Sequence, residues 1–186
     1  MTKLAIALLA LSTSAFAAPE TFVIDATHTA PRFEYSHFGY SNQMHRFDNT
    51  SGKIVLDRAA RTGSVDVSID AKSVNTGYTV FNEHIQGEDF FNTAAYPTIT
   101  FKSTSVKFKG DKPVAVNGDL TIKGVTKPVT LKVSSFHAMP HPMQKKDAIG
   151  ANASVKIKRS DFNMGKHAPY VSDDVTLSIG VEAIKE

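Results

Sequence analysis

The chain contains no cysteine and no tryptophan. Without cysteine it has no disulfide, no thiol chemistry and no cysteine-based zinc site, so its stability has to come from packing. An excess of one charge is also lacking, because the net charge is only +3 at pH 7 and the basic residues are scattered. Such scattering argues against a nucleic-acid-binding surface. No apolar run approaches the roughly 18 residues that a membrane-spanning helix needs, so no membrane span is expected.

The longest apolar stretch near the N-terminus runs from Leu4 to Leu11. It follows Lys3 and precedes Ala15-Phe16-Ala17, which has the small-x-small pattern that signal peptidase recognises. The sequence therefore predicts a signal peptide over residues 1–17 and a single domain over residues 18–186. The expected location is the periplasm of a bacterium.

Apolar and polar residues alternate through most of the remaining chain, most clearly over 65–70, 129–134 and 175–182. This period of two is typical of strands with one buried face and one solvated face. Short turn signals such as Lys109-Gly110-Asp111 separate the strands, so antiparallel pairing in a sandwich or a barrel is expected. The residues expected to face the interior are Val67, Ile69, Phe101, Leu120, Leu131, Val155 and Leu177.

The segment from Thr79 to Phe91 departs from this alternation. Tyr78, Phe81 and Ile85 are spaced as on one face of a helix, which predicts one or two short helical turns. We expect this segment to cross one end of the barrel and to cover one mouth of its cavity.

Aromatic residues are more numerous than the strand centres require, because the chain has twelve phenylalanines and only one of them, Phe16, lies in the signal peptide. Ordinary core packing accounts for any one of them. Together they favour a cavity, since a barrel of about eight or more strands can enclose space that its own side chains leave free. Such a cavity suits a hydrocarbon chain, because each buried CH₂ contributes about 0.8 kcal/mol.

Several segments in a fixed order resemble a known family. They are Val23-Ile24-Asp25 followed by His28, the stretch His37–Ser41, His84-Ile85 with Asp89–Asn92, and Gly118–Val129. Their order and spacing resemble the YceI-like polyisoprenoid-binding proteins over nearly all of residues 18–186. The resemblance implies an all-β fold, an extended antiparallel lipocalin-like β-barrel with one or two short helices over one end. It also implies a polyisoprenoid, a quinone-like molecule or a fatty amphiphile as the ligand inside the barrel.

Two positions depart from the pattern of that family. Asn82-Glu83 precedes His84 where the family often has Arg-Asp, and Arg46 precedes Phe47 where it usually has Gly. Recognition of the ligand's head group is therefore expected to differ from that of other members.

The candidate ligand-binding residues combine aromatic side chains with histidines of the matching segments. They are His28, Phe33, Tyr35, His37, Phe81, His84, Ile85, Phe90, Phe91, Phe101 and Phe162. We expect the polar end of the ligand near His28, His37 or His84, because a neutral imidazole donates one hydrogen bond and accepts another. The alternative is that each histidine is structural.

The predicted function is periplasmic binding or transport of a long apolar ligand, without catalytic residues, metal ligands or a cofactor. No nucleophile elbow and no glycine-rich phosphate loop occurs in the sequence, so an enzyme of those classes is not expected. An enzyme or redox partner acting on a quinone or a lipid head group is the alternative. Pairing of edge strands into a homodimer also stays open.

A third possibility is a copper-handling protein that uses the segment His137–Met143. Its prolines prevent a helix, and continued alternation would place two histidines and two methionines on one side. Imidazole and thioether ligands together suit copper. A proline-stiffened loop without a metal is the favoured interpretation.

Overall fold

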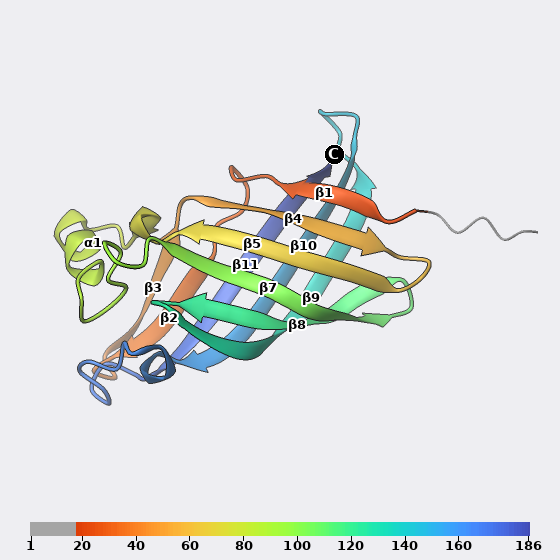
Figure 1. Cartoon of the computed structure of the whole chain (residues 1–186). Coiled ribbons are helices and arrows are strands. Elements are labelled where there is room, and N and C mark those ends of the chain that lie inside the picture. Colours follow the sequence, from red (N-terminus) through yellow and green to blue (C-terminus); the bar gives the residue numbers. More distant parts are fainter. Residues whose placement is uncertain (1–17) are drawn as a thin grey trace, which may run out of the picture.

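The computed structural model describes residues 18–186, so the predicted signal peptide lies outside the described residues. Eight consecutive neighbours in one antiparallel sheet form a barrel, which closes because the first strand also pairs with the last (Figure 1). These strands are β1 (Glu20–Ile24), β4 (Thr50–Asp57), β5 (Thr62–Asp70), β7 (Thr98–Lys109), β8 (Lys112–Ile122), β9 (Val125–Pro140), β10 (Asp147–Lys158) and β11 (Asp174–Lys185). The barrel and its antiparallel pairing confirm the fold predicted from the sequence.

Strand β11 is shared between two partners. Its C-terminal half pairs with β1, where Ile184 lies opposite Val23. Its N-terminal half pairs with β2 (Arg32–His37), where Leu177 lies opposite Phe33. The sheet continues from β2 into β3 (Ser41–Phe47) and β6 (Val74–Asn75), so these three strands extend the wall at one end of the barrel.

The same end carries the helical elements (Figure 1). The 3₁₀ helix η1 (Ala71–Ser73) leads into β6, and α1 (Thr79–Ile85) and a series of turns follow. Asn82 fixes the start of α1, because its Oδ1 accepts hydrogen bonds from the backbone N–H and the hydroxyl of Thr76. The 3₁₀ helix η2 (Arg159–Phe162) and the loop after it complete this end. The helix expected over one mouth is therefore confirmed.

The barrel interior is apolar because the alternation of each strand turns one set of side chains inward. All seven residues expected to face inward line the interior, which confirms the register of those strands. Their polar neighbours Asp66 and Asp70 on β5 are exposed to solvent. The hydrophobic core thus forms the wall of a cavity along the barrel axis.

Candidate ligand-binding chambers

Two adjoining chambers run from the middle of the barrel to the end that carries α1. The inner chamber has a volume of about 160 Å³ and is walled by the barrel strands. Arg32 and Ser178 are the only polar residues among those that line it. Such a space binds hydrocarbon by burial alone, because it offers almost no hydrogen-bonding group.

The outer chamber has a volume of about 340 Å³ and lies at the mouth, between β2, α1 and the loop after η2. Phe33, Phe47, Ile122 and Leu177 line both chambers, so the two spaces adjoin across these four side chains. The outer chamber also contains polar groups, and none of its lining residues is acidic. The polar residues that line it are Tyr35, His37, His84, Arg159, Lys166 and His167. A ligand with an apolar chain and a polar end would fit with its chain in the inner chamber and its polar end in the outer chamber.

Tyr35 lines the outer chamber, and a buried histidine that lines neither chamber lies behind it. The hydroxyl of Tyr35 lies 3.1 Å from Nε2 of His45, which is only 6% exposed. The rings of Phe33 and Phe81 pack against His45 at centroid distances of 5.4 and 5.6 Å. Burial raises the pKa of Tyr35 and lowers the pKa of His45, so both groups are neutral near pH 7.

Arg159 forms another part of this wall and holds the loop after η2 in place. Its Nε donates to the carbonyl of Ser172 at 2.8 Å, and its Nη2 donates to that of Val171 at 2.7 Å. Its Nη1 donates to the carbonyls of Met164 and Lys166. A guanidinium has five N–H donors, so one on Nη2 remains after these four bonds. Burial lowers the pKa of Arg159, while Asp173 and Tyr35 act in the opposite direction.

The structure brings nine of the eleven candidate residues to the chambers. Phe101 lines the inner chamber, Phe33 lines both, and the others line the outer chamber: Tyr35, His37, Phe81, His84, Ile85, Phe90 and Phe91. Phe162 lines neither chamber, because its side chain is 1% exposed and packs in the core.

The buried polar groups at the outer chamber, Arg159 in its wall and His45 behind Tyr35, are not among the residues predicted from the sequence, although the period of two points to them. Val155 and Ile157 face inward on β10, and Arg159, the first residue of η2, takes the next alternate position directly after the strand ends. His45 lies opposite Phe33 in the pairing of β2 with β3, and it therefore shares the inward face.

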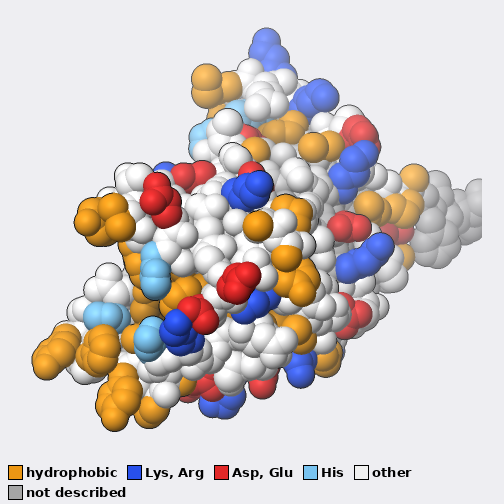
Figure 2. All heavy atoms as spheres, turned by 60° about the vertical axis from the view of Figure 1, so that its left-hand side comes forward, with side chains coloured by type: hydrophobic (Ala, Val, Ile, Leu, Met, Phe, Trp, Pro, Cys, Tyr) orange, Lys and Arg blue, Asp and Glu red, His pale blue; other side chains and the backbone are white. Residues whose placement is uncertain are grey.

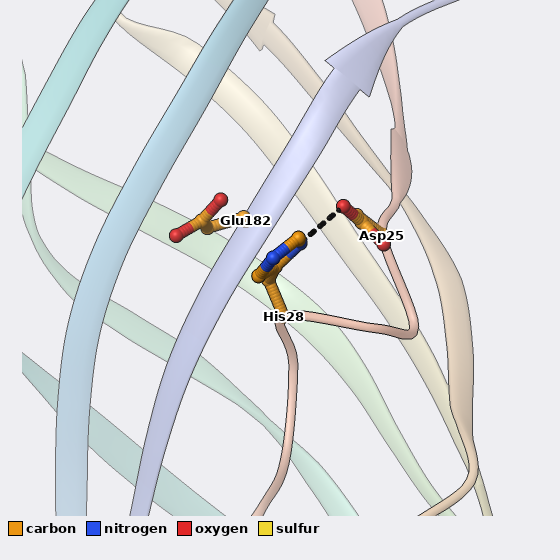
Figure 3. A group of neighbouring side chains, drawn as sticks. All are labelled: Asp25, His28 and Glu182. Atoms are coloured by element: carbon orange, nitrogen blue, oxygen red, sulfur yellow. Dashed lines mark hydrogen bonds and ion pairs between the residues drawn. The ribbon is translucent and has the colours of Figure 1, made fainter.

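His28 also lies outside both chambers, in the loop that joins β1 to β2. Its Nδ1 is 2.7 Å from Oδ2 of Asp25 (Figure 3), and the Thr27 hydroxyl donates to the other carboxylate oxygen at 2.6 Å. Hydrogen bonds from Thr27 and His28 lower the pKa of Asp25 to about 2, and Asp25 in turn raises the pKa of His28. These contacts support a structural role for His28 in closing the loop against β11.

One ligand atom from each of Asp25, His28 and Glu182 lies within 4.8 Å of the other two, so the three could approach a cation. Two of the three residues are exposed, and the Asp25 carboxylate already accepts from Thr27 and His28. The cluster explains the turn between β1 and β2 without an ion.

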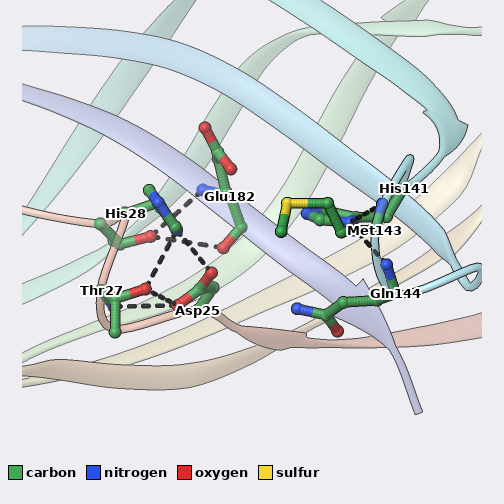
Figure 4. A network of polar contacts seen from close by, with 8 residues as sticks. Asp25, Thr27, His28, His141, Met143, Gln144 and Glu182 are labelled. Carbon is green, nitrogen blue, oxygen red and sulfur yellow. Dashed lines mark hydrogen bonds and ion pairs between the residues drawn. The ribbon is translucent and has the colours of Figure 1, made fainter.

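The segment His137–Met143 does not keep the expected alternation to its end. Strand β9 stops at Pro140, and residues 142–144 form a turn. Nδ1 of His141 accepts from the backbone N–H groups of Met143 and Gln144 at 3.2 and 3.1 Å (Figure 4). The expectation that all four side chains share one side was therefore wrong for this turn, because the strand that would impose it has ended.

Apolar side chains and histidines gather on the end of the molecule that carries the outer chamber (Figure 2). Phe38 is 52% exposed and also lines the chamber. Its backbone N–H donates to the carbonyl of Tyr170, and the two rings stack at 6.4 Å. The apolar lining of the outer chamber thus continues onto the surface around the mouth.

Comparison with known proteins gives a consistent result. The model of the YceI-like domain matches residues 22–183. Protein YceI of Escherichia coli O6:H1 is 38% identical over 174 residues, covering 93% of this chain and 90% of that protein. A UPF0312 protein of Shewanella denitrificans is 36% identical, with coverages of 89% and 87%.

Solved structures share the fold. The YCEI protein of Campylobacter jejuni superposes with a TM-score of 0.71 at 32% identity, covering 81% of this chain and 90% of that one. BcnA of Burkholderia cenocepacia gives 0.74 at 26% identity, with coverages of 86% and 99%. A polyisoprenoid binding domain from Saccharophagus degradans gives 0.66 at 22% identity, with coverages of 89% and 98%, a likeness of fold alone. Within residues 18–186, no helix is long and apolar enough to cross a membrane.

Proposed function

The chain belongs to the family of YceI-like domains, and we propose that it binds one long, apolar lipid with its chain in the inner chamber and its polar end in the outer chamber. The single observation that carries this proposal is the change in the chamber walls along the barrel axis, from apolar to partly polar. An almost wholly apolar chamber leads into a larger one that contains the hydroxyl of Tyr35, the guanidinium of Arg159 and several imidazoles.

The ligand class follows from the chemistry of these walls. A polyisoprenoid, a quinone-like molecule or a fatty amphiphile has a long chain that gains about 0.8 kcal/mol for each buried CH₂. Its head group is small enough for a few polar side chains to form hydrogen bonds with it. The name of the Saccharophagus degradans domain states that it binds polyisoprenoid, which is in keeping with this class.

The predicted signal peptide adds a location to the proposal. A chain exported to the periplasm would meet water-insoluble lipids between two membranes, and a closed barrel would shield such a lipid during transfer. We propose this carrier role together with binding, and it is separable from binding by experiment.

The test is to extract the purified protein with organic solvent and identify the extracted lipid by mass spectrometry. We expect one lipid of the class above per barrel, and rebinding of the same lipid after removal. The matched control is Val155→Phe, because Val155 lines the inner chamber and the larger apolar ring would fill part of it. Wild-type protein that carries no lipid and takes none up would overturn the proposal.

The same preparation distinguishes the alternatives. A copper-handling protein would bind copper without lipid, and an enzyme or redox partner would convert an added quinone or head group. Transport is tested by following a labelled lipid from donor to acceptor vesicles, where the wild type should accelerate transfer and Val155→Phe should do so less.

A further inference from the structure

A group of large apolar side chains stands exposed around the opening of the outer chamber (Figure 2). Its members, which we call the apolar rim, are Phe38, Tyr40, Tyr78, Val80 and Tyr170. They come from the turn between β2 and β3, the start of α1 and the loop after η2. Phe38 also lines the outer chamber, as do Phe81 and Val171, the chain neighbours of Val80 and Tyr170. The rim is therefore continuous with the space proposed for the ligand.

Two segments of the rim are held together by main-chain hydrogen bonds. The N–H of Phe38 donates to the carbonyl of Tyr170 at 2.8 Å, and the N–H of Ser172 donates to the carbonyl of Ser36 at 2.9 Å. The rings of Phe38 and Tyr170 stack at a centroid distance of 6.4 Å. The fold thus fixes the positions of both rings, although they remain 52% and 72% exposed.

The backbone of Phe38 adopts a conformation that is unfavourable for a bulky residue. Its φ is +54°, in the left-handed region that glycine and asparagine adopt most readily. Phe38 is therefore unfavourable in water for two reasons, because its backbone is strained and its ring remains in contact with solvent. An asparagine would form the same turn without either disadvantage. The ring at this position points to an apolar surface that it contacts outside the chain.

The chemistry of the rim and its place at the opening match the interface of a lipid bilayer. Tyrosine rings favour this interface, because the ring meets hydrocarbon while the phenolic hydroxyl stays among water and head groups. A long-chain lipid avoids water on its way into the barrel only if the opening of the chamber touches the bilayer. A second copy of this chain seated on the rim would instead close the opening.

We infer that the apolar rim docks on a phospholipid bilayer, with the opening of the outer chamber facing the membrane. Apolar burial rather than net charge drives this contact, because the same end of the barrel carries exposed groups of both signs. Glu83 lies on α1, and Lys166 forms an ion pair with Asp89. The inference rests on the proposed function, because it assigns the surface through which the same ligand enters and leaves.

Flotation of the purified protein with phosphatidylcholine vesicles measures the docking. The test variant combines Tyr40→Ser with Tyr170→Ser, because both rings are exposed and line neither chamber. We expect its affinity for vesicles to fall by about tenfold or more, the effect of losing one large apolar contact. High salt should leave wild-type flotation unchanged. The affinity for farnesol without vesicles, measured by displacement of N-phenyl-1-naphthylamine, should equal that of the wild type.

The matched control combines Met139→Ser with Met143→Ser. These side chains are 60% and 85% exposed and line neither chamber. They lie where β9 leads into β10, whereas η2 follows the other end of β10, so they are remote from the rim. Loss of apolar surface alone should not matter here, and the control should float with vesicles as the wild type does.

A further variant separates membrane contact from a role in folding. Phe38→Asn suits the positive φ of this position, so its melting temperature should be no lower than that of the wild type. Its affinity for vesicles should nevertheless fall. A lower melting temperature together with unchanged flotation would place Phe38 in the core and contradict its role in the rim.

The remaining outcomes are distinct. Wild-type protein that does not float, or tyrosine and methionine variants that float equally well, would overturn the inference and leave the proposed function standing. A wild-type dimer that becomes a monomer in the tyrosine variant would assign the rim to a second copy. Failure of farnesol and of the longer geranylgeraniol to displace the probe counts against the proposed function itself. Thermal unfolding confirms that each variant is folded, and Tyr40→Ser alone carries the test if the double variant is not.

Discussion

The ring of Phe101 lies against Gly118 so closely that a Cβ on Gly118 would sit 2.5 Å from Cζ of Phe101. The same Cβ would be 2.6 Å from the carbonyl oxygen of Lys102, on the neighbouring strand β7. A glycine in a strand usually weakens it, but here its missing side chain gives the ring of Phe101 its place in the wall of the inner chamber. A side chain at position 118 would therefore displace the ring of Phe101 from its place in this wall.

Replacing Gly118 with alanine should destabilise the barrel by about 1–3 kcal/mol, because the backbone of β7 cannot yield as a flexible side chain would. Gly150→Ala is the matched control, since a Cβ there would meet only the carbonyl oxygen of Val181, at an ordinary 3.8 Å. It should be neutral or slightly stabilising. Urea unfolding measures both free energies, and equal effects at the two glycines would contradict the steric explanation.

Neighbouring phenylalanines at the mouth should behave differently. Phe91 is 8% exposed and packs against Phe33 and Phe47 at centroid distances of 5.7 and 5.3 Å, so Phe91→Ala should cost about 3–5 kcal/mol of unfolding free energy. Phe90 is only partly buried and contacts His84. Phe90→Ala should release bound lipid faster while costing less stability. Dissociation rates and melting temperatures together test this, and loss of stability of the same size in both variants would place Phe90 in the core.

The Asp25–His28 pair should give a pH-dependent contribution to stability. Hydrogen bonds from Thr27 and His28 hold the pKa of Asp25 at about 2 in the folded protein, below the value of about 3.9 in an unfolded chain. The stabilisation is therefore present above pH 4 and is lost as the pH falls toward 2. Asp25→Asn should be about 1–2 kcal/mol less stable than the wild type at pH 7. Urea midpoints should converge near pH 2, and a constant difference would show that the charge of Asp25 contributes nothing.

The barrel could be predicted from the sequence because apolar and polar side chains alternate within the strands themselves, and this alternation indicates a strand with one buried face. The inward faces of β5, β8 and β11 follow directly from that alternation, and a shift of one residue would have reversed them. The helical segment was visible because Phe81 and Ile85 break the period of two.

The polar part of the site could be predicted only in part, because it depends on contacts between distant segments. His28 shares its sequence motif with Asp25, and only the closure of the loop onto β11 shows that it faces away from the chambers. The role of Arg159 depends on four carbonyls of residues 164–172, whose approach to its guanidinium has no signature in sequence. His45 was overlooked because a single histidine in a strand is most often structural.

The guanidinium of Arg159 should be required for order in the loop after η2. Arg159→Lys keeps a positive charge but cannot donate to four carbonyls in different directions, so we expect a loss of about 3 kcal/mol. Amides of residues 163–172 should exchange faster with deuterium. Arg58→Lys is the control, because Arg58 forms an exposed ion pair with Asp111 at 2.5 Å, and the change should cost less than 1 kcal/mol. Unchanged exchange in this loop would contradict the role of Arg159.

The junction between the two chambers should decide how much chain the protein can bury. Leu177 lines both chambers and lies opposite Phe33 and Val155 in the pairing of β11. Leu177→Phe should narrow this passage and confine the ligand to the outer chamber, at a cost of about 1–3 kcal/mol in stability.

The expected result of this change depends on the length of the ligand. In the wild type, affinity should rise from geraniol to farnesol to geranylgeraniol, because each buried CH₂ adds about 0.8 kcal/mol until the inner chamber is filled. In Leu177→Phe, geraniol should bind nearly as before, whereas the two longer alcohols should lose most of their advantage. Val114→Phe, at an exposed position on β8, should keep the wild-type dependence. Displacement of a fluorescent probe measures all three affinities.

An equal loss for every chain length would mean that the phenylalanine blocks the mouth, and no loss at all would mean that the chain never passes Leu177. Either result would contradict a lipid that extends from the outer chamber into the inner one.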